Sequence, residues 1–354
     1  MKADFTKNLI KWNQDAPSRV MPWKGEKDPY KIWLSEIILQ QTRVEQGLGY
    51  YHRFIKAFPN IQKLAAAPDQ EVFKLWEGLG YYTRCKNLLA TARYISKELK
   101  GVFPDNYEKI LSLKGIGPYT AAAISSFAYQ LPHAVVDGNV FRVLSRYFGI
   151  STPIDGTEGK KLYTLLANEV LDKKMPGIYN QAIMDFGAVI CKPQQPLCHQ
   201  CPQKKDCMAF RNNWIQQLPV KEKQLIKKKR WLNYFLVETR NEILVHRRNE
   251  KDIWENLYEF VLHESKEALL AEKKSMEKVF QQLLGKNKFT VTSISTSRKQ
   301  QLTHQTIEGL FIHVTINRKL VVNGQYVWVK KDQLSVYPFP RFITAYLQEI
   351  AHKA

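Results

Sequence analysis

The chain has 354 residues, enough for two ordinary domains, and its Lys and Arg outnumber its Asp and Glu by 53 to 33, a formal net charge of +20. A surplus of this size suits a polyanionic partner, either nucleic acid or an anionic membrane surface. Because no apolar run approaches the roughly twenty residues of a membrane span and the N-terminus is polar, we expect a soluble cytoplasmic protein without a membrane partner.

The first predicted element is an amphipathic helix over residues 5–20, which ends near Ala16-Pro17. The loop Met21-Pro22-Trp23-Lys24 follows. Its exposed aromatic side chain serves either in packing or as the wall of a ligand site.

The stretch from Tyr30 to Thr42, YKIWLSEIILQQT, has apolar residues at helical spacing on two opposite sides. This pattern predicts a helix buried nearly all round, with Glu36 in its middle. Burial disfavours the charged carboxylate and so raises its proton affinity, as a general acid working near neutral pH requires. A buried Glu can instead be a structural group satisfied by an Arg or by a helix start, and this helix alone does not decide between the two.

Residues 46–100 are predicted to be helical, with breaks at Pro59, Pro68 and Gly78-Leu79-Gly80. Tyr81 and Tyr82 follow the last break. Paired tyrosines of this kind are usually packing anchors, although they also stack on or wedge between bases.

The segment from Leu113 to Arg142 combines two helix starts. Gly115-Ile116-Gly117-Pro118 is a glycine turn that opens a helix, and the free amides at such a start can bind one phosphate. About twenty residues later, Asp137-Gly138-Asn139 opens a second helix. Taken alone, Asp137 would be read as the N-cap of that helix.

Residues 158–190 are again predicted to be helical, and four of the five cysteines follow at once as Cys191-x6-Cys198-x2-Cys201-x5-Cys207. Four thiolates so close together predict a soft metal centre. Tetrahedral zinc and a cubane iron–sulfur cluster are both chemically allowed.

Beyond a basic connector over residues 212–230, the pattern changes to short strands over 231–240, 242–248, 306–316 and 325–330, with a helix predicted over 266–284. The prediction for this half is therefore an α+β domain.

Several of these stretches together resemble a known family. LxGxGxxTA followed by VDGNVxRV is similar to the helix-hairpin-helix DNA glycosylases, and WLSEIILQQT and GLGYY resemble segments of the MutY-type adenine DNA glycosylases. The cysteine spacing is that of the [4Fe–4S] loop in endonuclease III-like glycosylases. The resemblance implies a multidomain protein: an all-α catalytic region over 1–211 that includes the cluster loop at 191–207, a linker over 212–230, and an α+β Nudix-like lesion-recognition domain over 231–354.

The resemblance also implies residue roles. Glu36 would protonate adenine at N7 and Asp137 would stabilise the positive charge that builds on the sugar, so the two carboxylates would need opposite environments. Tyr119 and Asn139 would orient them. The expected base pocket comprises Trp23, Lys24, Arg19 and Gln181. The expected DNA-binding residues are Gln41, Tyr81, Gly115, Gly117, Leu302, Thr303 and His304, of which the last three stand where the family carries a Phe-Ser-His loop that reads 8-oxoguanine. The cluster ligands would be Cys191, Cys198, Cys201 and Cys207.

The expected activity is that of a monofunctional adenine glycosylase, which extrudes adenine paired with 8-oxoguanine or guanine from double-stranded DNA. We expect a monomer that works at the bacterial nucleoid. An endonuclease III-type lyase needs an amine two residues after the second hairpin glycine, where this chain has Tyr119. A thymine-mismatch glycosylase would lack the second domain and Glu36. A non-enzymatic DNA-binding iron–sulfur protein would lack Glu36 or Asp137. A Nudix hydrolase would need an acidic metal-binding helix that this sequence does not contain.

Overall fold

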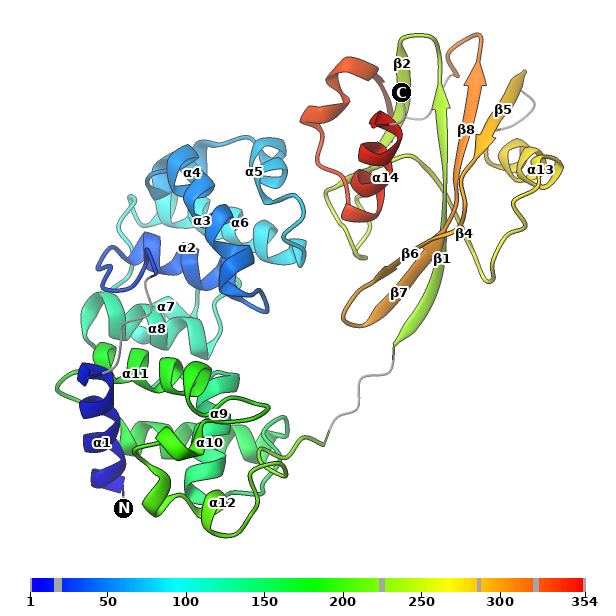
Figure 1. Cartoon of the computed structure of the whole chain (residues 1–354). Coiled ribbons are helices and arrows are strands. Elements are labelled where there is room, and N and C mark those ends of the chain that lie inside the picture. Colours follow the sequence, from blue (N-terminus) through cyan, green and yellow to red (C-terminus); the bar gives the residue numbers. More distant parts are fainter. Residues whose placement is uncertain (1, 16–20, 223–226, 285–287, 321–324, 353–354) are drawn as a thin grey trace. The chain divides into compact units, whose positions relative to one another are not determined.

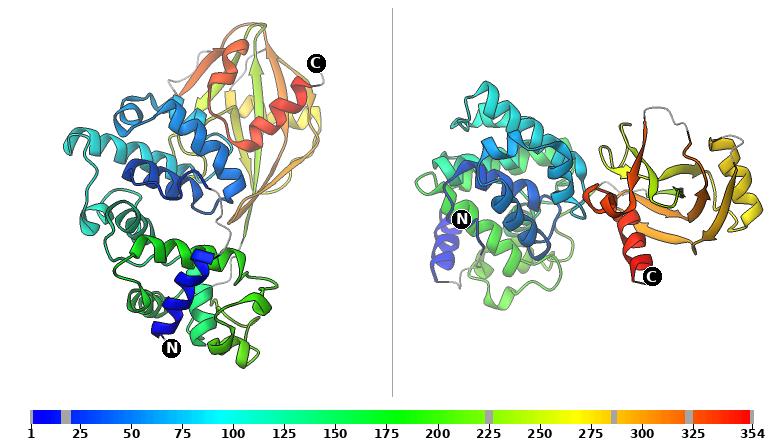
Figure 2. Two further views of the ribbon diagram at one scale, coloured as in Figure 1. Left: turned by 60° about the vertical axis from the view of Figure 1, so that its left-hand side comes forward. Right: turned by 90° about the horizontal axis from the view of Figure 1, so that it is seen from above.

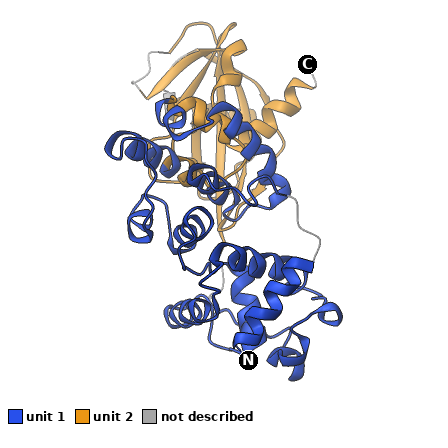
Figure 3. Cartoon of the chain, turned by 90° about the vertical axis from the view of Figure 1, so that its left-hand side faces the viewer, with its two compact units in different colours: residues 1–66, 87–224 blue, residues 67–86, 225–354 orange. Residues whose placement is uncertain are grey.

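The structure is a computed structural model that describes residues 2–15, 21–222, 227–284, 288–320 and 325–352. It contains two compact units, coloured separately in Figure 3. The first unit comprises residues 1–66 and 87–224, and the second comprises residues 67–86 and 225–354.

Helices follow one another through the first 211 residues, as the apolar spacing predicts (Figure 1). They are α1 (Lys2–Asp15), α2 (Pro29–Leu39), α3 (Val44–Ala57), α4 (Ile61–Ala66), α5 (Asp69–Trp76), α6 (Tyr82–Glu98), α7 (Tyr107–Leu111), α8 (Pro118–Tyr129), α9 (Gly138–Phe148), α10 (Thr157–Val170), α11 (Pro176–Val189) and α12 (Met208–Arg211), with short 3-10 turns η1 (Cys198–Gln200) and η2 (Lys204–Asp206).

Helix α8 lies at the centre of the first unit, where it contacts α2, α7 and α11. Its buried face carries the small residues Ala121, Ala122 and Ala123, so neighbouring helices can approach closely. The turn between α7 and α8 depends on Gly115, which has φ +78°, and a Cβ at this position would lie 2.6 Å from Cβ of Asn87. Glycine is therefore required both by the backbone conformation and by the space.

A mixed sheet forms the core of the second unit. Its long strand β1 (Lys228–Glu238) pairs in parallel with β7 (Gln305–Gly309) and β8 (Phe311–Ile316), and antiparallel with β2 (Glu242–Arg247) and β4 (Val261–Ser265). The remaining strands lie further out: β3 (Tyr258–Glu259), β5 (Phe289–Ile294), β6 (Arg298–Gln301) and β9 (Tyr326–Lys330). A 3-10 turn, η3 (Lys331–Val336), precedes the last helix.

Two helices cover opposite faces of this sheet, as Figure 2 shows from above. Successive strand residues point to opposite faces. Tyr234 accordingly packs against Phe342 of α14 (Arg341–Ala351), while Phe235 packs against Phe280 of α13 (Lys273–Leu284). The fold of this half is thus α+β, as predicted.

Two details differ from the sequence prediction. The strand expected over 306–316 is two strands, because β7 and β8 pair with different halves of β1 and separate at Leu310, whose amide donates to Oδ1 of Asn233 at 3.2 Å. The helix expected over 266–284 begins only at Lys273, so α13 carries a single acidic residue, Glu277. No helix in the described part of the chain is long and apolar enough to cross a membrane.

A buried ion pair joins β3 to the end of β2 in the second unit. The Arg248 guanidinium donates to Glu259 at 2.6 Å and to Asp252 at 2.9 Å, and the side chains of Arg248 and Glu259 are 5% and 3% exposed. Glu259 also accepts a hydrogen bond from the Tyr234 hydroxyl at 3.2 Å. Removing one member of such a pair leaves an uncompensated buried charge.

We predict that Arg248→Met lowers the free energy of unfolding by about 3–5 kcal/mol, and that adding Glu259→Gln restores part of the loss. Urea unfolding followed by tryptophan fluorescence measures both changes. As a control, Lys299→Ala removes an exposed pair with Glu308 and should cost less than about 1 kcal/mol. Equal effects of Arg248→Met and Lys299→Ala would contradict this account.

Candidate active site and cysteine loop

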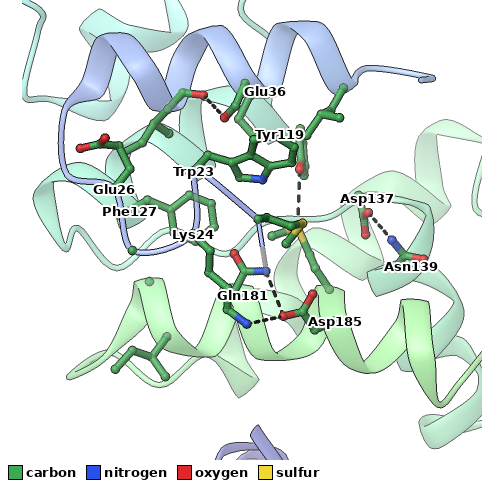
Figure 4. A pocket seen from close by; sticks show the side chains of 18 of the residues that line it. Trp23, Lys24, Glu26, Glu36, Tyr119, Phe127, Asp137, Asn139, Gln181 and Asp185 are labelled. Atoms are coloured by element: carbon green, nitrogen blue, oxygen red, sulfur yellow. Dashed lines mark hydrogen bonds and ion pairs between the residues drawn. The ribbon is translucent and has the colours of Figure 1, made fainter. Parts of the chain in front are cut away.

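A cavity of about 730 Å³ opens in the first unit between α2, α8, α11 and the start of α9 (Figure 4). The structure brings eight of the predicted site residues together in its lining: Trp23, Lys24, Glu36, Gln41, Tyr119, Asp137, Asn139 and Gln181. They come from segments that lie far apart in the sequence, so the packing of α8 against α2 and α11 creates the site.

Glu36 lies in the middle of α2, whose side chains are buried on nearly every side, and it is itself only 8% exposed. This burial raises the pKa of Glu36 from 4.5 to about 7, although a hydrogen bond from the Tyr119 hydroxyl lowers it. The negative charge of Asp137 contributes to this rise. Glu36 therefore keeps its proton close to neutral pH, as a general acid must.

Asp137 is the N-cap of α9, and its carboxylate accepts hydrogen bonds at 2.8 Å from the Val140 amide and from Nδ2 of Asn139. Burial raises the pKa of Asp137 above its usual value, although these hydrogen bonds and the charge of Arg142 limit the rise. The two carboxylates differ in exposure, because Glu36 is buried whereas Asp137 is only partly buried. They differ in hydrogen bonding: donors at the helix start stabilise the charged form of Asp137.

Tyr119 lies in the second position of α8 and interacts electrostatically with both carboxylates. Burial, the two carboxylates and a hydrogen bond to Glu36 hold the pKa of its hydroxyl well above 10. The hydroxyl also lies 3.5 Å from Sδ of Met184. Tyr119 is therefore a neutral donor between the two acids.

Lys24, Gln181 and Asp185 form a polar group at the other end of the cavity, as Figure 4 shows. The Lys24 ammonium and Nε2 of Gln181 both donate to Oδ2 of Asp185, at 3.0 and 3.1 Å. Trp23 packs edge-on against Tyr51 at 5.3 Å between ring centroids. Sequence reasoning missed Asp185; its spacing of four residues from Gln181 was the available signal.

Arg142 is a second residue that sequence reasoning left unassigned. It is buried, and its guanidinium donates to Oδ1 of Asn139 at 2.8 Å and to the backbone carbonyls of Gly187 and Cys191, both at 2.7 Å. Because Asn139 in turn donates to Asp137, a continuous chain of hydrogen bonds runs from the cysteine loop to this carboxylate.

The four cysteines of the loop are all partly buried. Burial, together with the neighbouring cysteines, raises the pKa of Cys201 to about 12. Arg146 of α9 donates to Sγ of Cys191 at 3.6 Å and to the Lys192 carbonyl at 2.7 Å. Four thiols gathered beside an arginine form a donor set suited to a soft metal group. No three His, Cys, Asp or Glu side chains of the described residues are arranged to hold a single metal ion.

The remaining predicted residues lie at loops and turns. Gly117 is the N-cap of α8, and no side chain accepts a hydrogen bond from the backbone amides of the first helical turn. Gln41 and Tyr81 are exposed and have positive φ angles of 55° and 50°, a strained conformation that is concentrated at functional sites.

Leu302, Thr303 and His304 form the tip of the hairpin between β6 and β7. The hydroxyls of Thr303 and Tyr81, both in the second unit, are hydrogen-bonded to each other. Arg19 lies outside the described residues.

Known proteins define the class to which this fold and site belong. Residues 34–166 match the family described as HhH-GPD superfamily base excision DNA repair protein, and residues 233–349 match the NUDIX domain. A thermostable thymine-DNA glycosylase is similar over 60% of this chain and 97% of its own, with a TM-score of 0.56 and 29% identity. Endonuclease III in a non-covalent complex with DNA shares the fold, with a TM-score of 0.52 and 19% identity over 60% of this chain and 98% of its own.

Proteins of similar sequence define the family more narrowly than the solved structures do. The adenine DNA glycosylase of Buchnera aphidicola subsp. Baizongia pistaciae is 32% identical over 98% of this chain and 96% of its own length. The human adenine DNA glycosylase is 40% identical over 60% of this chain and 41% of its own length. The chain therefore belongs to the adenine DNA glycosylase family, as its motifs predict.

Because the pKa of Glu36 is raised in the folded protein, we expect the free energy of unfolding to depend on pH. Between pH 4.5 and about 7 the folded state holds a proton on Glu36 that the unfolded state has released, so the free energy of unfolding falls as the pH rises through this range. We predict that Glu36→Gln stabilises the protein by up to about 3 kcal/mol at pH 8 and has little effect at pH 4.5. Denaturant unfolding at both pH values measures the difference.

Glu45→Gln is the matched control, because Glu45 is an exposed glutamate in α3. Its effect should stay within about 0.5 kcal/mol at both pH values. A Glu36→Gln effect that is the same at pH 4.5 and pH 8 would show that Glu36 has an ordinary pKa.

Proposed function

We propose that this protein excises adenine paired with 8-oxoguanine or guanine in double-stranded DNA, by hydrolysis of the N-glycosidic bond and without strand cleavage. The observation that carries the proposal is the cavity in which a glutamic acid with a pKa of about 7, a tyrosine hydroxyl and an N-cap aspartate line one wall. A base must leave the stack to enter such a cavity.

In the proposed reaction, Glu36 donates its proton to N7 of the extruded adenine. The bond between C1′ of the sugar and N9 then breaks, and the electron pair leaves with the neutral base. Protonation converts a poor leaving group into a good one, and a general acid of this kind typically contributes 10²–10⁴-fold to the rate.

Asp137 would stabilise the positive charge that develops on the sugar as the bond breaks. Its carboxylate can do this because two hydrogen bonds at the start of α9 favour the charged form. Water then adds to C1′, and its proton passes to a carboxylate. Asn139 would fix the orientation of Asp137, since Arg142 holds Asn139 in place.

Tyr119 would keep the reaction monofunctional. A glycosylase that also cuts the strand uses an amine to form a Schiff base with C1′. Here the corresponding side chain is a phenol whose pKa lies well above its usual range, so it can donate a hydrogen bond to Glu36 but cannot form an imine.

DNA would be held by groups outside the cavity. The free backbone amides of the glycine turn that opens α8 would bind one backbone phosphate, since this helix start carries no side-chain cap. Gln41 and Tyr81 would occupy the space left in the duplex, and their exposed, strained loops support this role. Leu302, Thr303 and His304 would read the base opposite the adenine from a hairpin tip.

We further propose that Cys191, Cys198, Cys201 and Cys207 hold a [4Fe–4S] cluster. The support is an all-thiol donor set with the family's spacing, gathered where Arg146 and backbone groups contact the sulfurs. Such a cluster would supply covalent cross-links that fix the loop beside α9. The chain would act as a monomer at the nucleoid, with a catalytic region over 1–211, a linker over 212–230 and a lesion-recognition domain over 231–354.

The proposed function is tested by single-turnover cleavage of duplexes that contain adenine opposite 8-oxoguanine, an oxidised pyrimidine, or a G:T mispair. We expect cleavage of the adenine strand only, and only after alkali treatment. Glu36→Gln should lower the rate constant by about 10²–10⁴-fold. The wild-type rate constant should fall about tenfold per pH unit above pH 7, because Glu36 then loses its proton. Alkali-independent cutting at oxidised pyrimidines would instead indicate a lyase.

The cluster is tested by metal analysis of the purified protein. We expect about four iron atoms per chain, and we expect Cys198→Ser to lose iron and to lower the free energy of unfolding. Cys85→Ala is the control, because Cys85 is a buried cysteine outside the four-cysteine motif and should not affect the iron content. One zinc ion per chain would contradict the proposal.

A further inference from the structure

Asp185 lines the cavity and accepts hydrogen bonds from two other residues of the cavity wall. It lies one helical turn after Gln181 on α11, and its side chain is only 7% exposed. A single oxygen, Oδ2, accepts hydrogen bonds from Gln181 at 3.1 Å and from the Lys24 ammonium at 3.0 Å. Lys24 belongs to the loop before α2, so Asp185 joins two separate segments of the cavity wall.

This arrangement fixes the orientation of the Gln181 amide. A primary amide can turn by half a revolution and present either its oxygen or its NH2 group. An ionised carboxylate only accepts hydrogen bonds, and the Lys24 ammonium beside it compensates its charge. The NH2 group must therefore face Asp185. No described residue donates a hydrogen bond to the other end of the amide, Oε1, which remains available to a bound base.

We propose that Asp185 is a positioning residue that sets base specificity, by making Gln181 present a hydrogen-bond acceptor to the 6-position of an extruded purine. The inference rests on the proposed function and deepens it. Adenine carries a 6-amino donor that an acceptor can bind. Guanine and hypoxanthine carry a 6-oxo acceptor, which would be left unpaired in the cavity and opposed by Oε1.

If Asp185 served only as the ion-pair partner of Lys24, its substitution would have a different effect on the excision rates. Losing that ion pair would loosen the cavity for every base and would lower all excision rates together. The orientation of the amide, in contrast, distinguishes bases by their 6-substituent alone. The ratio of rates for two such bases separates the two roles.

The experiment measures single-turnover excision of adenine, hypoxanthine and unsubstituted purine, each opposite the same base, by the full-length protein. In Asp185→Asn the new amide can donate or accept, so both orientations of Gln181 become possible. We expect the preference for adenine over hypoxanthine to fall at least tenfold from its wild-type value. The rate for unsubstituted purine, which has no 6-substituent, should fall by a smaller factor than that for adenine.

Two further variants complete the test. In a Gln181→Met background no amide remains to be oriented, so adding Asp185→Asn should leave the preference unchanged. Lys24→Met keeps the acceptor at Asp185 and should lower the three rates together without changing their ratio. Thermal melts of each variant verify that it is folded.

Equal losses for all three bases in Asp185→Asn, or an undiminished change of preference in the Gln181→Met background, would overturn the proposal. Failure of the proposed function would look different: the wild-type protein itself would release none of the three purines.

Discussion

The site depends on two carboxylates that line one cavity, one of them buried and the other partly buried. Removing a carboxylate from water costs free energy unless the group is protonated or accepts hydrogen bonds. The two acids here differ in which of these compensates the cost. Glu36, on a helix that is apolar on nearly every side, keeps its proton. Asp137 accepts two hydrogen bonds at the start of α9. A single cavity can therefore hold a proton donor beside a group that stabilises positive charge.

The scaffold maintains this difference through α9. Its first residue follows Asp137, and its buried arginines, Arg142 and Arg146, contact the backbone and a sulfur of the cysteine loop. Arg142 also holds Asn139, which donates to Asp137. The geometry of the Asp137 carboxylate is thus coupled to the integrity of the cysteine loop, and a loop fixed by a metal cluster would fix Asp137 with it.

Local patterns predicted the helices that hold Glu36 and Asp137, but they did not predict partners contributed by distant segments. The two apolar sides of the helix around Glu36 and the N-cap position of Asp137 are visible in the sequence, because they depend on neighbours within a turn or two. Asp185 shares its oxygen with Lys24, 161 residues away, and no local pattern contains that pairing. The separation of β7 from β8 likewise depends on the pairing of each with β1.

The proposed role of Glu36 requires its carboxyl group to remain protonated near neutral pH in the folded protein. It is tested most directly by the titration of carbon-13-labelled glutamate side chains by NMR, with the Glu36→Gln spectrum used to assign the Glu36 carboxyl signal. A midpoint close to pH 7 is the predicted result. A midpoint near 4.5, the ordinary value for glutamate, would contradict the account, because the proposed acid would then be ionised at the pH at which it must donate its proton.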